Sequence, residues 1–214
     1  MEKLKNNKGK IIITTIVCLL PILIGLLLWD KLPNEIATHF GEDGIPNGWS
    51  SKAFAVFGLP LFVAGCHLLC TVATCADPKN QRLGDKMFSL ILWICPLVTL
   101  FCAVSTYGYA LGMDINVEMI GRLFVGLVFV VVGNYLPKCR QNYTVGIKLP
   151  WTLHDEDNWN STHRFAGWVW MIGGVVFILD VFVNVGGMWT SLGLILVLTF
   201  VPMVYSFVYY VKHK

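Results

Sequence analysis

Nineteen consecutive residues without a charge follow the basic start of the chain: Ile11-Ile-Ile-Thr-Thr-Ile-Val-Cys-Leu-Leu-Pro-Ile-Leu-Ile-Gly-Leu-Leu-Leu-Trp29. An α-helix needs roughly 20 apolar residues to cross the hydrocarbon core of a bilayer, which is about 30 Å thick. No small-x-small cleavage site is present, and Asp30-Lys31 follow the run directly. The stretch therefore predicts a retained membrane-spanning helix and not a cleaved signal peptide.

Further apolar runs occupy most of the chain. The ranges 53–76 and 87–113 contain no Asp, Glu, Lys or Arg, and 117–136 contains only Glu118 and Arg122. The run 165–211 carries only Asp180 and is too long for one crossing, so we place a turn at 184–191. The sequence thus predicts an all-α, polytopic membrane protein, a single domain over 1–214 with six transmembrane helices. The predicted spans are 11–29, 53–76, 87–111, 117–136, 165–185 and 189–211.

Composition and charge support this class. The chain is 56% hydrophobic and 14% charged, against about 45–50% and about 25% in soluble domains. A net charge of +3 is too small for nucleic-acid binding. Thirteen Lys and Arg residues fall in the tails and loops on one side of the predicted spans, against Lys31 and Lys52 on the other. The positive-inside rule therefore predicts that both termini are cytoplasmic.

Two loops are long enough to carry a site. In the predicted external loop 30–52, Leu32, Ile36 and Phe40 are four residues apart, which favours a short helix lying on the membrane. Gly and Pro residues then predict tight turns, and Trp49 with Lys52 fits an interfacial anchor before the second span. This loop is either a surface that receives a ligand or an ordered connection back into the membrane.

The predicted cytoplasmic loop 137–164 contains a short alternating segment over 143–148, too brief to stand alone as a sheet. Thr152 is a plausible N-cap of a helix that continues into the fifth span, because acidic residues follow it in the first turn. The loop is either an amphipathic linker on the membrane or a docking surface or small-ligand pocket. The polar residues available for such a site are Asn134, Arg140, Asn142, Lys148, His154, His163 and Arg164.

Two ionisable residues lie inside predicted spans at matching depths. Arg122 and Asp180 are each about five residues from the external end of their helix, and a charge alone in hydrocarbon is costly. We therefore expect a salt bridge or a shared polar cavity between them, which either fixes helix register or belongs to an ion pathway. The chain has no HExxH, P-loop or GxSxG motif, so no catalytic residue, metal or cofactor is expected.

Both loops carry recognisable motifs. The segment Leu32-Pro-x3-Ala-Thr-His-Phe-Gly-x2-Gly-Ile-Pro-Asn-Gly-Trp-Ser-Ser-Lys52 resembles the DUF1648 motif. The segments Gly133-Asn-Tyr-Leu-Pro-Lys138, Asn142-Tyr-x2-Gly-Ile-Lys-x-Pro-Trp-Thr-Leu153 and Trp159-x2-Thr-His-Arg164 resemble the SdpI-type family, named for immunity to the sporulation-delaying-protein toxin. We assign a DUF1648-like part to 11–76 and an SdpI-like part to 117–211. Lys148-Leu149 departs from the Arg-Thr expected there, and Lys cannot form a planar bidentate fork.

The resemblance implies a bacterial plasma-membrane immunity protein that protects against a secreted, membrane-active peptide toxin. Some such proteins also hold a winged-helix repressor at the membrane. Membrane lipid is the other expected partner. The residues expected to meet the toxin are His39, Phe40, Trp49, Lys52, Arg122 and Asp180. Those expected to form a cytoplasmic docking motif are Asn134, Pro137, Asn142, Tyr143, Gly146, Lys148, Pro150, Trp151, Thr152, Trp159, His163 and Arg164.

Two other functions stay open. A transporter of peptides or small molecules would need a polar path along several spans, to which Asp180 and Arg122 would contribute. An intramembrane enzyme would use the group His154, Asp155, Glu156 and His163. Efflux driven by the proton-motive force would indicate the first, and a bound metal abolished by His163→Ala the second.

Overall fold

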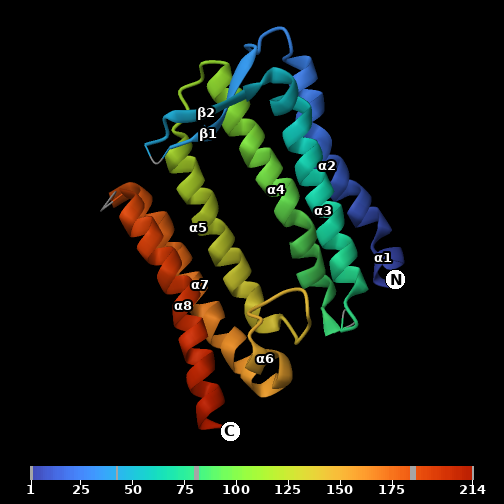
Figure 1. The fold of residues 1–214 in the computed structure, drawn as a ribbon, viewed down its shortest axis with the longest axis vertical. Helices are drawn as coiled ribbons and strands as arrows, with labels where there is room; N and C mark the ends of the chain where they lie inside the picture. The colour runs from blue at the N-terminus through green and yellow to red at the C-terminus, as the bar shows by residue number, and fades with distance from the viewer. Residues whose placement is uncertain (1, 42, 80–81, 184–186, 214) are drawn as a thin grey trace. The chain divides into compact units, whose positions relative to one another are not determined.

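The computed structural model describes residues 2–41, 43–79, 82–183 and 187–213 (Figure 1). Within them, six helices are long and apolar enough to cross a membrane, which confirms the predicted all-α polytopic class. The predicted turn at 184–191 falls partly on residues 184–186, which lie outside the described part of the chain. Residues 187–191 are helical instead, because α8 begins at Gly187. The long helices are α2 (Lys8–Leu27), η1 with α3 (Phe54–Gly58 and Leu59–Ala76), α4 (Asp85–Ala110), α5 (Val117–Tyr135), α7 (Glu156–Val183) and α8 (Gly187–Lys212).

The chain forms two compact units, which we describe separately. The first comprises Met1–Ala76 and Phe88–Glu118, and the second comprises Asp77–Met87 and Met119–Lys214. The first unit contains the short helix α1 (Glu2–Asn6), and the second contains the single turns η3 (Leu136–Lys138) and α6 (Pro150–His154).

A β-hairpin covers one end of the first unit, where we had predicted a short helix. Strands β1 (Glu35–Phe40) and β2 (Pro46–Ser51) pair antiparallel, with Ala37 opposite Trp49 (Figure 1). The helix prediction was wrong because residues four apart share a face of a strand as well as of a helix. The turn residues supply the hairpin's reversal, since Gly44 adopts a φ of 72°.

The core of the first unit lies directly under this hairpin. Ile36 of β1 is fully buried, and Val56 and Tyr107 from the neighbouring helices pack in the same cluster. The hydroxyl of Tyr107 donates a hydrogen bond to the carbonyl of Pro21 at 3.2 Å. The hairpin is therefore anchored to α2, η1 and α4 through apolar packing.

In the second unit, α5 and α7 approach each other closely at glycines. A Cβ on Gly133 of α5 would lie 2.8 Å from the backbone nitrogen of Met171 and 3.0 Å from the carbonyl oxygen of Gly167. Gly126 of α5 and Gly174 of α7 meet in the same way, one helical heptad along. Small residues at such positions allow the backbones of membrane helices to touch.

The predicted helix from Thr152 into the fifth span is interrupted. Thr152 lies inside α6, and α6 ends at His154. Asp155 adopts an extended conformation, and its carboxylate accepts the backbone N–H groups of Asp157 and Asn158 at 2.9 and 3.1 Å. Asp155 therefore caps the start of α7, and Thr152 does not.

Candidate functional site

The hairpin presents one aromatic side chain outward and turns another inward. Trp49 is 56% exposed, and His39 is exposed and hydrogen-bonded to Asn47. Phe40 instead packs edge-on against Tyr109, with ring centres 5.4 Å apart. Lys52 holds the base of the hairpin, because its Nζ donates to the carbonyl of Trp29 at 3.0 Å. The hairpin and its base thus hold four of the six predicted external residues, of which His39 and Trp49 are exposed and Phe40 turns inward.

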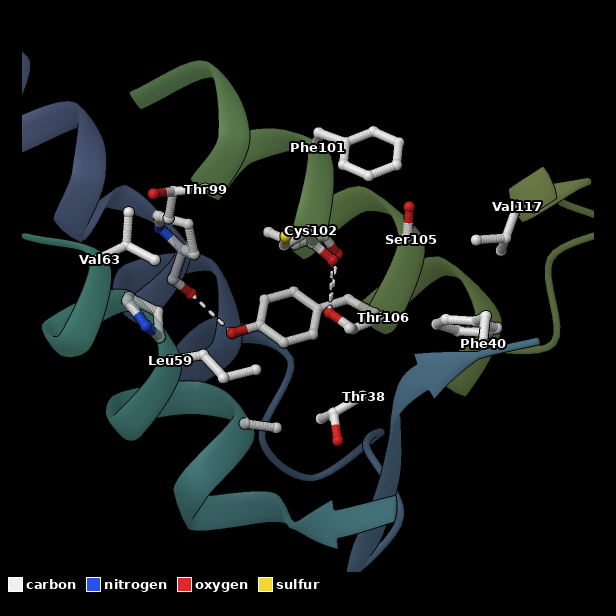
Figure 2. A pocket seen from close by; sticks show the side chains of 15 residues that line it. Thr38, Phe40, Leu59, Val63, Thr99, Phe101, Cys102, Ser105, Thr106 and Val117 are labelled. Carbon is white, nitrogen blue, oxygen red and sulfur yellow. Dashed lines mark hydrogen bonds between the residues drawn. The ribbon is translucent and has the colours of Figure 1, made fainter. Parts of the chain in front are cut away.

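A pocket of about 210 Å³ lies under the hairpin within the first unit (Figure 2). Phe40 and Val117 lie towards one side of it, and Val63 and Thr99 towards the other. None of the described residues that line the pocket is charged. The lining comprises Pro21, Thr38, Phe40, Ala55, Leu59, Pro60, Val63, Thr99, Phe101, Cys102, Ala103, Ser105, Thr106, Tyr107 and Val117.

The predicted ion pair is present in the second unit. Arg122 of α5 and Asp180 of α7 lie 3.7 Å apart, between a guanidinium nitrogen and a carboxylate oxygen. Their side chains are only 11% and 9% exposed. The prediction that the two charges pair is therefore confirmed, and the pair joins α5 to α7 near the glycine contacts.

Asn142 organises the loop that follows η3. Its side-chain oxygen accepts the backbone N–H groups of Thr144 and Val145 at 2.9 and 2.7 Å. Its amide nitrogen donates to the carbonyls of Arg140 and Val145 at 2.9 and 3.0 Å. The alternating segment 143–148 therefore pairs with no strand in the described chain and instead wraps around one buried amide.

His163 and Trp159 support the same loop from α7. The Nε2 of His163 accepts the backbone N–H of Ile147 at 2.9 Å, and its Nδ1 donates to the carbonyl of Trp159 at 2.8 Å. Trp159 is fully buried and donates from its indole to the carbonyl of Cys139 at 2.7 Å. Gly146 has a φ of 119°, and a Cβ there would strike the His163 ring. Trp159 and His163 therefore fix the course of this loop from inside the second unit.

Two further residues that the sequence reasoning missed hold this loop. The carboxylate of Asp77 accepts the backbone N–H of Tyr143 at 2.7 Å and the hydroxyl of Thr144 at 3.0 Å. The side-chain amide of Gln141 donates to the carbonyls of Thr152 and Leu153. The sequence does show Asp77 directly after an apolar run. That position indicates that the carboxylate needs a polar partner, but it does not identify the partner.

Some residues of the predicted docking motif are buried and others are exposed. Asn142, Thr152, Trp159 and His163 are buried and hold the loop, and the indole of Trp151 donates to Ser206 of α8 at 2.9 Å. The members that reach the surface are Asn134, Pro137, Tyr143, Lys148, Pro150 and Arg164, with Gly146 half-buried.

Three of the four residues expected for an intramembrane enzyme are engaged in structural contacts. Both ring nitrogens of His163 are occupied, Asp155 caps α7, and Glu156 forms an exposed ion pair with Arg82 at 3.2 Å. In the part of the chain that the structure describes, no three His, Cys, Asp or Glu residues are grouped to hold a metal ion.

Comparisons with known proteins find a matching family model in each half of the chain. Residues 138–206 match the SdpI/YfhL protein family, and residues 16–64 match a domain of unknown function, DUF1648. The chain is similar to the immunity protein SdpI of Bacillus subtilis (strain 168), with 27% identity over 208 residues. That alignment covers 95% of this chain and 97% of the Bacillus protein. No solved structure matches.

Proposed function

Because the chain is a multi-pass plasma-membrane protein of the SdpI type, we propose that it is an immunity protein that protects its bacterium from a secreted, membrane-active peptide toxin. The observation that carries this proposal is the similarity to an immunity protein along nearly the full length of both chains. The role requires binding or exclusion of the peptide and no chemical step.

The hairpin is the best candidate for recognition. A two-stranded hairpin is marginal on its own, but this one is anchored by Ile36 and Lys52 and keeps Trp49 and His39 exposed. Aromatic side chains on rigid backbone are effective anchors in protein interfaces. On the predicted orientation, this surface faces the compartment from which a secreted peptide arrives. We propose Arg122 and Asp180 as further residues of the response to the toxin.

The test is survival and membrane potential of a sensitive bacterium that expresses the full chain and is challenged with a sporulation-delaying-type peptide. We expect the wild type to protect and Trp49→Ala and His39→Ala to protect less at equal expression. Trp189→Ala is the matched control, because Trp189 is also a largely exposed tryptophan but lies outside the hairpin, at the start of α8. Loss of protection in all three variants would indicate general damage and contradict recognition by the hairpin, and no protection by the wild type would contradict immunity to this peptide.

A second candidate activity is signalling through a winged-helix repressor on the cytoplasmic side. The feature that favours it is the loop held by Asn142, which keeps Tyr143, Lys148 and Arg164 exposed on a folded support. We propose that a tagged repressor moves to the membrane when the peptide is added, and that Lys148→Ala with Arg164→Ala abolishes this movement. Lys212→Ala is the control for loss of positive charge, and recruitment that persists in the double variant would contradict the proposal.

A further inference from the structure

We propose that the pocket under the hairpin binds one apolar side chain of the peptide toxin together with a neighbouring main-chain amide. The proposal rests on the proposed immunity function and adds to it the place and chemistry of recognition. The residues that line this pocket all belong to the first unit, as does the hairpin. We treat the exposed surface of the hairpin and this pocket as two parts of one recognition site.

The size and lining of the pocket define the apolar part of the ligand. Its volume is about 210 Å³, whereas a protein cavity of about 150 Å³ lined by apolar residues accommodates benzene. The pocket therefore has room for one aromatic or branched aliphatic side chain. The described lining residues carry no charge, so a charged side chain entering it would lose its hydration without gaining a partner.

One hydroxyl in the lining defines the polar part of the ligand. Ser105 is 3% exposed, and its Oγ has no hydrogen-bond partner among the described residues. Its neighbours on α4 are satisfied, since Thr99 and Thr106 each donate to a carbonyl of their own helix at 2.8 Å. Figure 2 shows the side chain of Ser105 among those that line the pocket.

An unpaired hydroxyl distinguishes a peptide from a lipid as the occupant. Ser105 belongs to α4, which is long and apolar enough to cross a membrane, and the hydrocarbon core of a bilayer has no water to satisfy a polar group. A buried hydroxyl is unfavourable until it finds a partner. An acyl chain offers no such partner, whereas the backbone of a peptide offers both N–H and C=O beside each apolar side chain.

The hairpin connects the pocket to the exposed recognition surface. Thr38 and Phe40 of β1 line the pocket, and His39 between them is exposed. Successive side chains of a strand point to opposite faces. One strand therefore presents its two faces to the two parts of the site.

Crosslinking tests which molecule occupies the pocket. Phe101, which lines it, is replaced by the photoreactive residue p-benzoylphenylalanine in the full chain in membranes, and the adduct is identified by mass after addition of the sporulation-delaying-type peptide. Val104 on the same helix is 56% exposed and serves as the matched outward position. We expect a peptide adduct at position 101 and not at 104. A lipid adduct alone at 101 with excess peptide would overturn the proposal in favour of a lipid site.

Ser105→Ala tests the hydroxyl with the smallest change. We expect the melting temperature to stay unchanged or rise, because an unpaired buried group is removed, and the protective capacity to fall by about tenfold, the effect of losing one good hydrogen bond. Ser105→Leu fills the pocket and should abolish protection, and Val104→Leu is its control. If the wild type protects and both Ser105 variants protect equally well, the pocket proposal fails alone. If the wild type does not protect, the proposed function fails and the pocket proposal falls with it.

Discussion

Asn142 is the residue on which the loop after η3 depends most. It is 1% exposed, and both ends of its amide are used by backbone groups of neighbouring residues. Asn142→Ala leaves several of these groups buried without a partner, each at a cost of roughly 1–3 kcal/mol. We expect the variant to lose about 3 kcal/mol of stability, measured as a lower melting temperature, while His154→Ala at an exposed position changes little.

The reactivity of the neighbouring Cys139 thiol provides a second, independent measure of whether the loop opens in Asn142→Ala. Burial raises the pKa of Cys139 to about 11, although the Asn142 amide lowers it in part. The thiol is therefore protonated at neutral pH, and maleimides react with the thiolate. In a chain that retains Cys139 alone, we expect slow labelling that becomes fast in Asn142→Ala. Rapid labelling without the substitution would contradict the buried loop.

Replacing only one residue of the Arg122–Asp180 pair should destabilise the protein more than replacing both by apolar residues. Both side chains are largely buried, and removing one partner of a buried ion pair typically costs about 3–5 kcal/mol. We expect Asp180→Asn to lower the melting temperature and Arg122→Met with Asp180→Leu to recover most of the loss. A double variant that melts no higher than Asp180→Asn would contradict a cost that comes from the unpaired charge.

The contacts of a single residue could be predicted from the sequence where a physical rule left few possible partners for its side chain. Arg122 and Asp180 lie at matching depths in hydrocarbon, so the cost of an isolated charge was sufficient to pair them. Asp77 has the same need for partners, but it lies at the end of a span, where water or many loop groups could satisfy it. Its bond to Tyr143, 66 residues away, depends on the course of the whole loop and has no local signal.

At the scale of elements, the contact between α5 and α7 depends on glycine. A Cβ at Gly133 would lie 2.8 Å from the backbone of α7, so Gly133→Ala must push the helices apart. Gly193→Ala in α8 is the matched control, because nothing lies within 4 Å of a Cβ there. We expect the first variant to melt at a lower temperature, and the second to be neutral or more stable, because alanine is the better helix former. Equal melting temperatures for the two variants would contradict the close helix packing.

The elements of the two loops were harder to predict than the spans. The spacing of Leu32, Ile36 and Phe40 fits one face of a helix and one face of a strand equally well, and the paired strand β2 decided between them. In the other loop, the acidic residues after Thr152 correctly indicated a helix start, but Asp155 ends one helix and caps the next. The local sequence therefore indicated that a capped helix begins here, but it did not identify Asp155 as the capping residue.

At the scale of the molecule, the spans followed from hydrocarbon thickness alone. A bilayer requires a minimum length of apolar helix, and the helical stretches Phe54–Ala76 and Val117–Lys138, which are long and apolar enough to cross one, lie close to the predicted 53–76 and 117–136. The division into two units and the pocket of the first unit could not be predicted in this way. They depend on which apolar side chains face each other, and hydropathy does not distinguish an exposed residue such as Val104 from a buried one such as Val56.

The orientation of the whole molecule is the prediction on which the recognition site depends. Thirteen Lys and Arg residues against two predict that both termini are cytoplasmic, and that the hairpin, separated from the N-terminus by α2, is external. Full-length chains fused at the C-terminus to green fluorescent protein or to alkaline phosphatase separate the two orientations, because the first fluoresces only in the cytoplasm and the second is active only outside it. We expect fluorescence without phosphatase activity, with the same fusions to a protein of known topology as the control. Active phosphatase would place the hairpin and its pocket inside the cell, where a secreted peptide does not arrive first, and would transfer the search for the toxin site to the loop held by Asn142.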